Sequence, residues 1–369
     1  MTDTTFRFCD ELGPKAIVYL YEPRVNLQGI VVVDNVAAGP AIGGLRMAPD
    51  VSLEECFRLA RAMTYKNAAA GIPHGGGKSV IFADPSMQPA AKERLIRAYA
   101  NAIRPISDYI VGPDMGTNET AMAWVLDEIG RSVGLPREIG GIPLDEIGAT
   151  GFGVVISAEA AIEHMDGNMD GIRVAMQGFG SVGTHAARYF VQKGALLVAA
   201  ADSSGTLYKA DGLDVVQLVA FKEEGRHFNE FSGAENLHRE EVIAVDCDIL
   251  VPAARPDVIH THNQDQVKAR LVVQGANIGV TDEAETELHE RGVLCVPDFI
   301  SNAGGVICAA IEYQGGTETQ AFAVIEEKVR CNTREVLSRS VTTSVAPRQA
   351  AVSMAEERVR AAIQLRRWS

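Results

Sequence analysis

A glycine-rich turn between a predicted strand and a predicted helix places the strongest constraint on the fold of this 369-residue chain. Residues 174–183 read VAMQGFGSVG, so Gly178, Gly180 and Gly183 form the pattern G-x-G-x-x-G. An apolar run precedes the turn and a stretch with helical spacing follows it. In this context the pattern is typical of a dinucleotide-binding turn. The first glycine makes the turn, the second admits the pyrophosphate, and the third lets the helix approach the sheet.

Short apolar runs alternate with helical or loop sequence through the second half of the chain. The predicted strands there are 173–177, 196–201, 249–251, 271–273 and 293–296. Such alternation favours a parallel sheet covered on both faces by helices. The first part of the chain predicts strands at 16–21 and 29–33 and helices at 52–66, 90–103 and 122–129. Residues 134–147 form the predicted linker, and 319–368 form a helical tail that could pack on the first domain.

The length predicts two domains, since a domain has roughly 150 residues, and the alternation of strands and helices predicts the α/β class. The 34 Lys and Arg residues face 48 Asp and Glu residues, giving a net charge of −14. That charge repels phosphate backbones, so we expect neither nucleic acid nor a membrane as partner. No signal peptide and no apolar run of ~20 residues is evident, which predicts a cytoplasmic protein. The 6 scattered cysteines lack metal-ligand spacing, so we expect reduced thiols and no metal.

The strand after the glycine turn ends in a carboxylate. Asp202 follows Gly183 by 19 residues, and a carboxylate there can accept both ribose hydroxyls of NAD and repel the extra phosphate of NADP. Ser203 and Ser204 follow without an arginine beside them, so we expect NAD, with NADP as the less favoured cofactor. The candidate cofactor ligands are Gly178, Phe179, Gly180, Ser181, Val182, Gly183, Asp202 and Ser203.

A second glycine cluster surrounds two lysines. Residues 75–79 read GGGKS, but a phosphate-binding G-x-x-x-x-G-K loop would need glycine in place of Ile72. We therefore interpret this segment as a loop whose glycines let backbone and substrate approach Lys78, with Lys66 reaching the same cleft. Two close ammonium groups disfavour each other's charged form, so one can act as a base while the other pairs with a carboxylate. Asp114, in the loop VGPDMGTN, is the candidate carboxylate.

Taken together, these segments resemble the glutamate/leucine/phenylalanine/valine dehydrogenase superfamily, which performs NAD(P)-linked oxidative deamination of L-amino acids. The resemblance runs from about Pro23 to Glu335 and is carried by GGLRM, MTYKNA, IPHGGGK, PDMGT, ATGFGV, GFGSVG, PAA, QGAN and SNAGGV. It implies an N-terminal substrate-binding and oligomerisation domain over 1–135 joined by C-terminal helices of about 320–369. A Rossmann dinucleotide-binding domain would cover 145–320, with a cleft between the two domains, and the enzyme would be a homo-oligomer.

The resemblance also implies a role for each matched position. Lys66 would bind the substrate α-carboxylate, Lys78 would activate water and stabilise the carbinolamine, and Asp114 would assist proton transfer at the amine. Gly43 and Gly44 would lie against the substrate. The remaining implied cofactor contacts are Thr150, Ala253, Asn277 and Asn302, of which the last would also lie near the substrate.

Two positions depart from the glutamate enzymes of this superfamily. Those enzymes have a lysine directly before G-G-x-R and a serine seven residues after the asparagine of N-A-G-G, where this chain has Ile42 and Ala309. Neither residue can pair with a carboxylate, and an unpaired buried anion is strongly unfavourable. We therefore expect an apolar side-chain pocket lined by Ile42, Met115, Ala309 and Val306.

The sequence thus predicts NAD-dependent deamination of an amino acid like leucine, valine or phenylalanine to the 2-oxo acid and ammonia. The alternative within the class is a glutamate dehydrogenase whose carboxylate partner comes from elsewhere in the chain. A non-catalytic NAD-binding regulator or a scaffold is disfavoured, because neither needs Lys66, Lys78 and Asp114 together.

Overall fold

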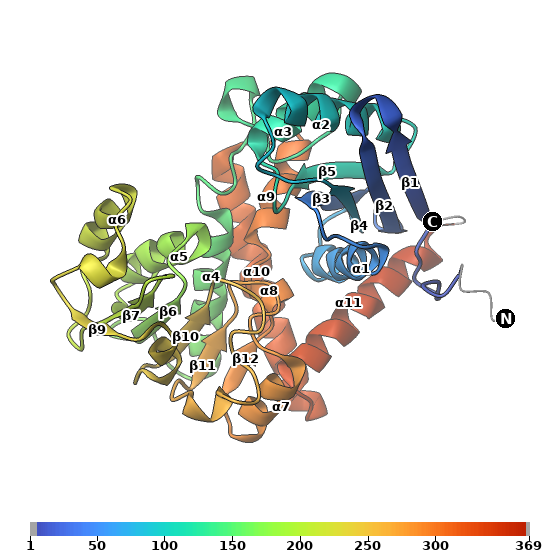
Figure 1. Cartoon of the computed structure of the whole chain (residues 1–369). Coiled ribbons are helices and arrows are strands. Elements are labelled where there is room, and N and C mark those ends of the chain that lie inside the picture. Colours follow the sequence, from blue (N-terminus) through green and yellow to red (C-terminus); the bar gives the residue numbers. More distant parts are fainter. Residues whose placement is uncertain (1–5, 367–369) are drawn as a thin grey trace. The chain divides into compact units, whose positions relative to one another are not determined.

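The computed structural model describes residues 6–366, which form two compact units, each built on its own sheet (Figure 1). The first unit contains the chain up to Leu144, residues 306–321, and the chain from Ser353 onward. The second contains 145–305 and 322–352. The predicted α/β class with a Rossmann-type second domain is confirmed.

The unit boundaries differ from the predicted ones near the C-terminus. Helix α9 (Gly304–Tyr313) belongs largely to the first unit, because its Ala309 packs with Ile42. Most of α10 (Glu318–Thr343) belongs to the second unit, and its Thr333 hydroxyl lies 3.0 Å from the Ser157 hydroxyl of α4 (Ala149–His164). Tertiary packing therefore divides a tail that the sequence assigns to one domain.

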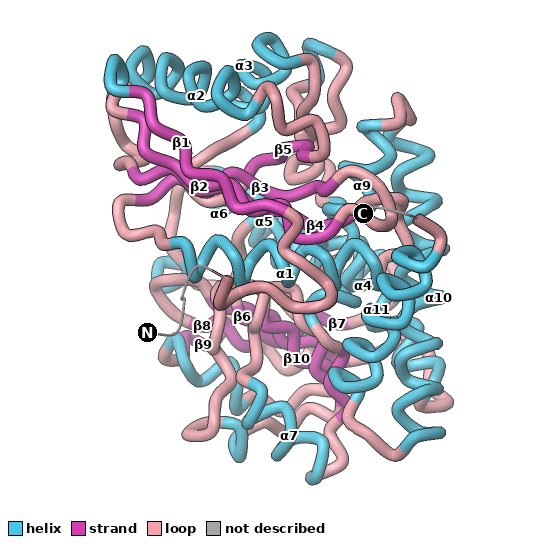
Figure 2. Tube along the Cα trace, turned by 90° about the vertical axis from the view of Figure 1, so that its right-hand side faces the viewer, coloured by secondary structure: helices cyan, strands magenta, loops and turns pink. Residues whose placement is uncertain are grey.

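The first unit is built on a mixed five-stranded sheet of order β1-β2-β4-β3-β5. Strand β2 is antiparallel to β1 and β4, whereas β3 is parallel to β4 and β5. The strands are β1 (Ala16–Glu22), β2 (Leu27–Asn35), β3 (Ala41–Ala48), β4 (Gly75–Phe82) and β5 (Tyr109–Pro113). Helix α1 (Leu53–Ala69) covers one face, and α2 (Pro89–Ile103) and α3 (Glu119–Ile129) cover the other (Figures 1 and 2).

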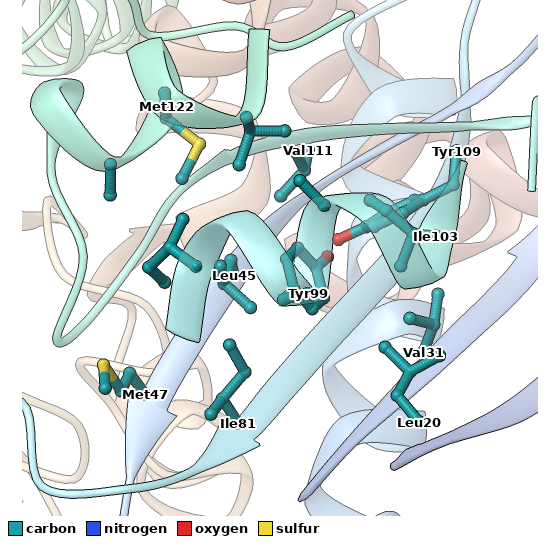
Figure 3. Packing of buried hydrophobic residues seen from close by; sticks show 14 of the residues in the cluster. Leu20, Val31, Leu45, Met47, Ile81, Tyr99, Ile103, Tyr109, Val111 and Met122 are labelled. Atoms are coloured by element: carbon teal, nitrogen blue, oxygen red, sulfur yellow. The ribbon is translucent and has the colours of Figure 1, made fainter. Parts of the chain in front are cut away.

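Alternation along β2 explains why both faces are covered. Val31 and Val33 belong to the apolar cluster formed with α2 and α3, whereas Ile30 and Val32 belong to the cluster formed with α1. Successive side chains of a strand point to opposite faces, so a strand that is apolar at every position needs cover on both. Figure 3 shows the larger cluster, in which Val31 lies near Leu20.

Residues 75–79, which the sequence predicts as a loop, lie in strand β4, and the glycine-rich segment 41–48, for which the sequence predicts no element, forms the neighbouring strand β3. Glycine disfavours strands, but packing outweighs that preference here. A Cβ on Gly75 would lie 1.7 Å from the Asn35 carbonyl oxygen, and a Cβ on Gly76 would lie 2.0 Å from the Thr64 amide nitrogen of α1. These two glycines therefore let neighbouring backbone approach β4 and do not leave room for substrate.

The second unit contains a seven-stranded sheet of order β12-β11-β10-β6-β7-β8-β9, in which β12 to β7 are parallel and β8 and β9 are antiparallel. The strands are β6 (Arg173–Gln177), β7 (Leu196–Ala201), β8 (Thr206–Tyr208), β9 (Glu235–Leu237), β10 (Ile249–Pro252), β11 (Leu271–Val273) and β12 (Leu294–Val296). The sequence predicts the parallel strands but not β8 and β9, which are too short to show alternation.

The remaining helices complete the two units. They are α5 (Ser181–Gln192), α6 (Val215–Glu223), α7 (Asp282–Glu290), α8 (Asp298–Ser301) and α11 (Pro347–Gln364). Short 3₁₀ helices occur at Pro23–Val25, Arg137–Ile139, Phe228–Glu230, Arg239–Ala244 and Gln264–Gln266. None of the helices in residues 6–366 combines the length and apolarity that a membrane span requires.

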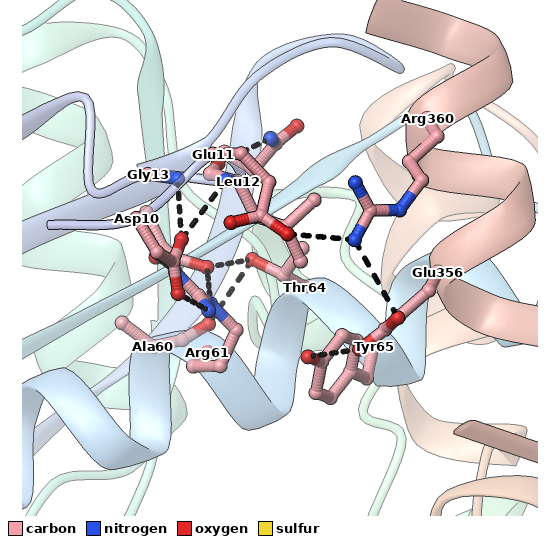
Figure 4. Close-up of polar contacts among 12 residues, drawn as sticks. Asp10, Glu11, Leu12, Gly13, Ala60, Arg61, Thr64, Tyr65, Glu356 and Arg360 are labelled. Atoms are coloured by element: carbon pink, nitrogen blue, oxygen red, sulfur yellow. Dashed lines mark hydrogen bonds and ion pairs between the residues drawn. The ribbon is translucent and has the colours of Figure 1, made fainter. Parts of the chain in front are cut away.

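The C-terminal end of α1 is held by the last helix, as Figure 4 shows for Tyr65 and Glu356. The Tyr65 hydroxyl donates to Glu356 of α11 at 3.0 Å. Arg358, two residues on, donates to the Ala69 carbonyl at 2.6 Å. Carbonyls of a last helical turn lack partners within the helix, and Arg358 supplies one. The part of α11 from Ser353 onward therefore packs on α1 of the first unit.

Arg61 anchors the middle of α1 to two carboxylates of unequal burial (Figure 4). It pairs with Asp34 of β2 at 2.8 Å and with Asp10 at 2.7 Å. The Asp34 side chain is 0% exposed, whereas that of Asp10 is 41% exposed. The same guanidinium thus makes one buried and one surface ion pair.

We expect Asp34→Ala to lower the free energy of unfolding by about 3–5 kcal/mol, because it removes one partner of a buried pair. Asp10→Ala is the matched control and should cost about 0–1 kcal/mol, because its pair is screened by solvent. Urea denaturation followed by circular dichroism measures both. Equal losses of unfolding free energy in Asp34→Ala and Asp10→Ala would show that burial does not decide the strength of these ion pairs.

Candidate functional site

Lys78 and Asp114 form an ion pair at one end of the first sheet. The Lys78 Nζ lies 2.8 Å from the Asp114 Oδ2, and the side chains are 7% and 23% exposed. Lys78 lies in β4 and Asp114 directly follows β5, and both strands flank β3. Arg46 of β3 donates its Nε to the same carboxylate oxygen at 2.9 Å. The sequence reasoning missed Arg46, although it is the arginine of the GGLRM motif.

The two cations control the charge of Asp114. Burial raises the pKa of this carboxyl, but Lys78 and Arg46 more than offset that effect, so the pKa lies below its ordinary value of 3.8. The carboxylate is therefore ionised at neutral pH and is a weak base in this arrangement. Because the folded pKa is depressed, its contribution to stability is present above about pH 3.8 and is lost as the pH falls through the folded pKa.

Gly43 and Gly44 lie where β3 and β4 interrupt their pairing. The register runs from Ile42 opposite Gly76 to Leu45 opposite Ser79 and skips the two glycines. A Cβ on Gly44 would lie 2.7 Å from the Asp114 Cβ and 3.2 Å from the Lys78 Nζ. Glycine at this position is therefore a steric requirement of the Lys78–Asp114 pair.

A chain of buried hydroxyls reaches the carbonyl of Gly43. Tyr99 donates to Ser79 at 2.7 Å, Ser79 lies 3.0 Å from the Tyr109 hydroxyl, and Tyr109 donates to the Gly43 oxygen at 3.0 Å. Figure 3 shows the hydroxyl ends of Tyr99 and Tyr109 directed toward one another. Burial raises the pKa of both tyrosines, which keeps them neutral donors. No pattern in the sequence indicates this chain, since it joins three separate elements.

Lys66 is half-buried in the last turn of α1. Its neighbour Asn67 donates to the Gly75 carbonyl at 2.7 Å and to the Ile42 carbonyl at 3.3 Å. These contacts press the last turn of α1 against the starts of β3 and β4. Lys66 therefore lies on the helix that packs on the strand of Lys78, as a shared substrate site requires.

Ile42 and Ala309, distant in the sequence, share one apolar cluster. Its other members are Ile110, Val133 and the partly buried Leu144, all from the first unit. The sequence reasoning missed these three because nothing local marks them as neighbours of Ile42. Two residues predicted to line the same pocket, Met115 and Val306, are not members of the cluster, and Met115 is 56% exposed. The Met115 carbonyl accepts a hydrogen bond from the Met47 amide, and this contact holds Met115 in a surface turn.

Two of the predicted cofactor segments of the second unit, the glycine turn and Ala253, meet at the carboxyl ends of β6 and β10. Gly178 follows β6 and has φ +104°, and a Cβ on it would lie 2.6 Å from the Cβ of Ala254, which follows Ala253 after β10. Strand β7, which follows β6 in the sequence, lies on one side of β6 in the sheet, and β10 lies on the other side. Such a switch point is where open α/β sheets bind ligands.

The three glycines of the turn differ in what surrounds them. A Cβ on Gly183 would lie 1.9 Å from the Gly178 oxygen, so this glycine lets α5 approach the turn. A Cβ on Gly180 would meet nothing within 4 Å, and α5 begins after Gly180 without a side-chain cap. Open space beside uncapped N–H groups fits the pyrophosphate of a dinucleotide.

The side chains of the other turn residues differ in their exposure to solvent. Ser181 is exposed and Val182 is half-buried, as contacts to a ligand require. Phe179 is 5% exposed and its ring centroid lies 5.3 Å from that of Phe228, so its side chain packs in the core and does not face the cofactor. For Phe179, only the backbone remains as a candidate ligand.

Asn302 presents an acceptor with no partner among the described residues. Its side chain is 2% exposed and donates to the Asn277 side chain at 2.9 Å, while its Oδ1 is buried and unbonded. Thr150 lies close by, since a Cβ on Gly304 would be 3.3 Å from the Thr150 Cα. Buried acceptors are normally satisfied, so this oxygen fits an N–H donor such as a carboxamide.

Asp202 is already engaged by the protein. Its Oδ1 accepts from the Ser204 amide at 2.7 Å, its Oδ2 lies 2.7 Å from the Lys222 Nζ, and its side chain is 7% exposed. Burial raises its pKa, but Lys222 and Ser204 outweigh that and lower it. Ser203 is exposed. Lys222, which the sequence reasoning missed, partly cancels the repulsion between Asp202 and a 2′-phosphate.

Two alanine substitutions in the turn should separate folding from cofactor binding. Gly183→Ala should lower the thermal midpoint, since the overpacking costs about 1–3 kcal/mol. Gly180→Ala should leave the midpoint unchanged and weaken NADH binding about tenfold, because the methyl group fills the space for the pyrophosphate. Thermal scans and NADH fluorescence titration measure the two effects. Unchanged NADH affinity in the Gly180→Ala variant would show that the pyrophosphate does not bind beside Gly180.

Comparison with known proteins relates the whole chain to one family. A family model described as Glutamate/Leucine/Phenylalanine/Valine dehydrogenase matches residues 140–367. A second, described as Glu/Leu/Phe/Val dehydrogenase, dimerisation domain, matches residues 23–131.

Similar proteins cover almost the full length. Glutamate dehydrogenase from Aeropyrum pernix is 36% identical over 359 residues, 90% of this chain and 85% of that protein. NADP(+)-dependent glutamate dehydrogenase from Pyrobaculum calidifontis is 35% identical, over 92% of this chain and 87% of that protein. The hetero-hexameric glutamate dehydrogenase from Thermus thermophilus, in a Leu bound form, has a TM-score of 0.85 at 32% identity, covering 95% of this chain and 90% of that one. L-tryptophan dehydrogenase from Nostoc punctiforme has a TM-score of 0.76 at 25% identity, covering 97% and 98%.

Proposed function

Since the chain belongs to the Glutamate/Leucine/Phenylalanine/Valine dehydrogenase family and is therefore an amino acid dehydrogenase, we propose that its substrate is an L-amino acid with an apolar side chain. The reaction is the reversible oxidative deamination of that amino acid with NAD to the 2-oxo acid and ammonia. The observation that carries the proposal is that Ile42 and Ala309, the two positions that depart from the glutamate enzymes, pack in one apolar cluster with Ile110, Val133 and Leu144.

The nearest arginine along the chain is committed elsewhere. Arg131, two residues before Val133, donates to the carbonyls of Tyr109 at 3.1 Å and Ile103 at 2.8 Å. Arg131 is therefore not available to pair with a substrate carboxylate buried against the cluster, and an unpaired buried charge is strongly unfavourable. Leucine, valine and phenylalanine avoid that cost.

Glutamate is the alternative substrate, because the relatives from Aeropyrum pernix and Pyrobaculum calidifontis are named glutamate dehydrogenases. It would require a cation from outside the apolar cluster. A panel of leucine, valine, phenylalanine and glutamate, assayed with NAD and with NADP by nicotinamide absorbance, separates the two. Turnover of glutamate without turnover of the apolar amino acids would overturn the proposal.

In the proposed mechanism, Lys66 binds the substrate α-carboxylate and Gly43 and Gly44 provide the backbone against which the substrate lies. Asp114 accepts a proton from the substrate ammonium, and loss of the Cα hydride then leaves an iminium; a bound nicotinamide dinucleotide would accept that hydride. Lys78 can act as a base once it has lost a proton, and Asp114, 2.8 Å away, is in contact with it. Lys78 then takes a proton from the water that adds to the iminium. Protonation of nitrogen and collapse of the carbinolamine release ammonia and the 2-oxo acid.

The cofactor contacts in the proposal are the turn at Gly178 to Gly183, Thr150, Ala253, Asn277 and Asn302. Asp202 favours NAD, because its carboxylate would repel the 2′-phosphate of NADP. Lys222 weakens that preference, and the relative from Pyrobaculum calidifontis is named as NADP(+)-dependent. NAD should therefore give the higher kcat/KM, with measurable activity on NADP.

We also propose that the chain is a homo-oligomer assembled through its first unit. The match to a dimerisation domain over residues 23–131 supports this, and the Thermus thermophilus neighbour is named as hexameric. Light scattering on the purified chain tests the proposal.

Lys78→Ala should reduce kcat by about 10²–10⁴-fold, because proton transfer by a positioned side chain contributes that much. NADH binding should remain, since Lys78 lies in the first unit. Lys15→Ala is the control, because its pair with Asp108 is at the surface with side chains 39% and 50% exposed. Steady-state rates and NADH fluorescence provide the measurements. Unchanged turnover in Lys78→Ala would contradict the proposed mechanism.

A further inference from the structure

Helix α9 carries a half-buried carboxylate one turn beyond Ala309. Glu312 follows Ala309 by three residues, so both lie on the same side of the helix. Its Oε2 accepts from the Gly134 amide at 2.5 Å, and its Oε1 accepts from the amides of Leu135 at 3.0 Å and Ile142 at 2.7 Å. One side chain thus holds both ends of the irregular segment 134–142.

The residues flanking this segment are members of the apolar cluster. Val133 comes directly before it and is 1% exposed, and Leu144 comes two residues after Ile142. The Val133 amide donates to the Val111 carbonyl of β5 at 2.9 Å, which attaches the start of the segment to the sheet. Its far end, which leads to Leu144, is attached to α9 through Ile142 and Glu312.

Three backbone N–H groups of the segment depend on Glu312. The N–H groups of Ile139, Gly140 and Gly141 donate to carbonyls within the segment, whereas those of Gly134, Leu135 and Ile142 donate to the Glu312 carboxylate. Burial raises the pKa of Glu312 above its ordinary value, against the opposing effect of the three N–H donors. Replacing the carboxylate by an amide would leave one acceptor oxygen for three partly buried N–H donors and would place an NH2 group against at least one of them, which favours rearrangement of the segment.

We propose that Glu312 is a positioning residue that sets the width of the substrate side-chain pocket and thereby the selectivity between small and large apolar amino acids. It acts through the walls formed by Val133 and Leu144 and does not touch the substrate. The inference rests on the proposed function, because it takes the cluster around Ile42 and Ala309 as the side-chain pocket. A small movement of these walls is sufficient, since one methylene in such a pocket changes kcat/KM about 10–200-fold.

The chain offers a matched control in Glu318, at the start of α10. Glu318 pairs with Arg137 of the same segment at 3.0 Å, with side chains 42% and 49% exposed. Glu318→Gln therefore removes an exposed ion pair from the same segment whose amides donate to Glu312. The two variants make the same chemical change at different burial.

The experiment compares kcat/KM for valine and phenylalanine in the wild type, Glu312→Gln, Glu312→Asp and Glu318→Gln. We expect Glu312→Gln to change the valine-to-phenylalanine ratio at least about tenfold, with the KM for NAD unchanged. Glu312→Asp, which keeps the charge, should restore part of the ratio, and Glu318→Gln should match the wild type. A wild-type ratio in Glu312→Gln, an equal change in Glu318→Gln, or a parallel loss of activity on both substrates would overturn the inference. Should Glu312→Gln fail to fold, the ratio in Glu312→Asp decides.

Failure of the proposed function would be visible separately. If the wild type acts on glutamate and not on apolar amino acids, the substrate proposal fails. The ratio is then taken between glutamate and the homologue longer by one methylene, and the same variants test Glu312. An altered ratio in Glu312→Gln alone would still support its positioning role, and an unaltered ratio would refute it.

Discussion

Close backbone packing at glycine is the constraint on which the rest of the first unit depends. Gly75 and Gly76 let β2 and α1 approach β4, and Gly44 leaves the space in which Lys78 meets Asp114. A methyl group at any of these positions would overlap atoms of neighbouring elements. The helix, the sheet and the ion pair therefore have to be accommodated together, and Lys78 is held by the same contacts that build the sheet.

Three carboxylates of the structure receive donors from elements distant in the sequence. Asp114 is held by cations from β3 and β4, Asp202 by Lys222 of α6, and Glu312 by the amides of an irregular segment. The donors decide the chemistry available to each group. Two cations keep Asp114 ionised and weakly basic, whereas only neutral amides oppose the effect of burial on Glu312. A sequence shows a carboxylate but not its donors, so these differences are invisible before folding.

Local patterns predicted much of the fold and several site residues. The glycine turn, the parallel strands and the helices α1, α2 and α5 follow from periodicity, and Gly183 packs against Gly178 as its spacing indicates. The strands β3 and β4 were missed because glycine hides their periodicity. Phe179 is a predicted cofactor ligand whose ring packs on Phe228, and an apolar ring beside a turn carries no signal of its direction in the sequence.

The sequence by itself determined the class of the protein, because a dinucleotide turn and the lysine and glycine motifs depend only on residues close together in the chain. Tertiary structure alone decided which groups surround them: Arg46 beside Asp114, Lys222 beside Asp202, and Ile110 and Val133 beside Ile42. The physical reason is that charge compensation and apolar burial act through space. Their partners come from elements that meet only when the sheets and helices pack.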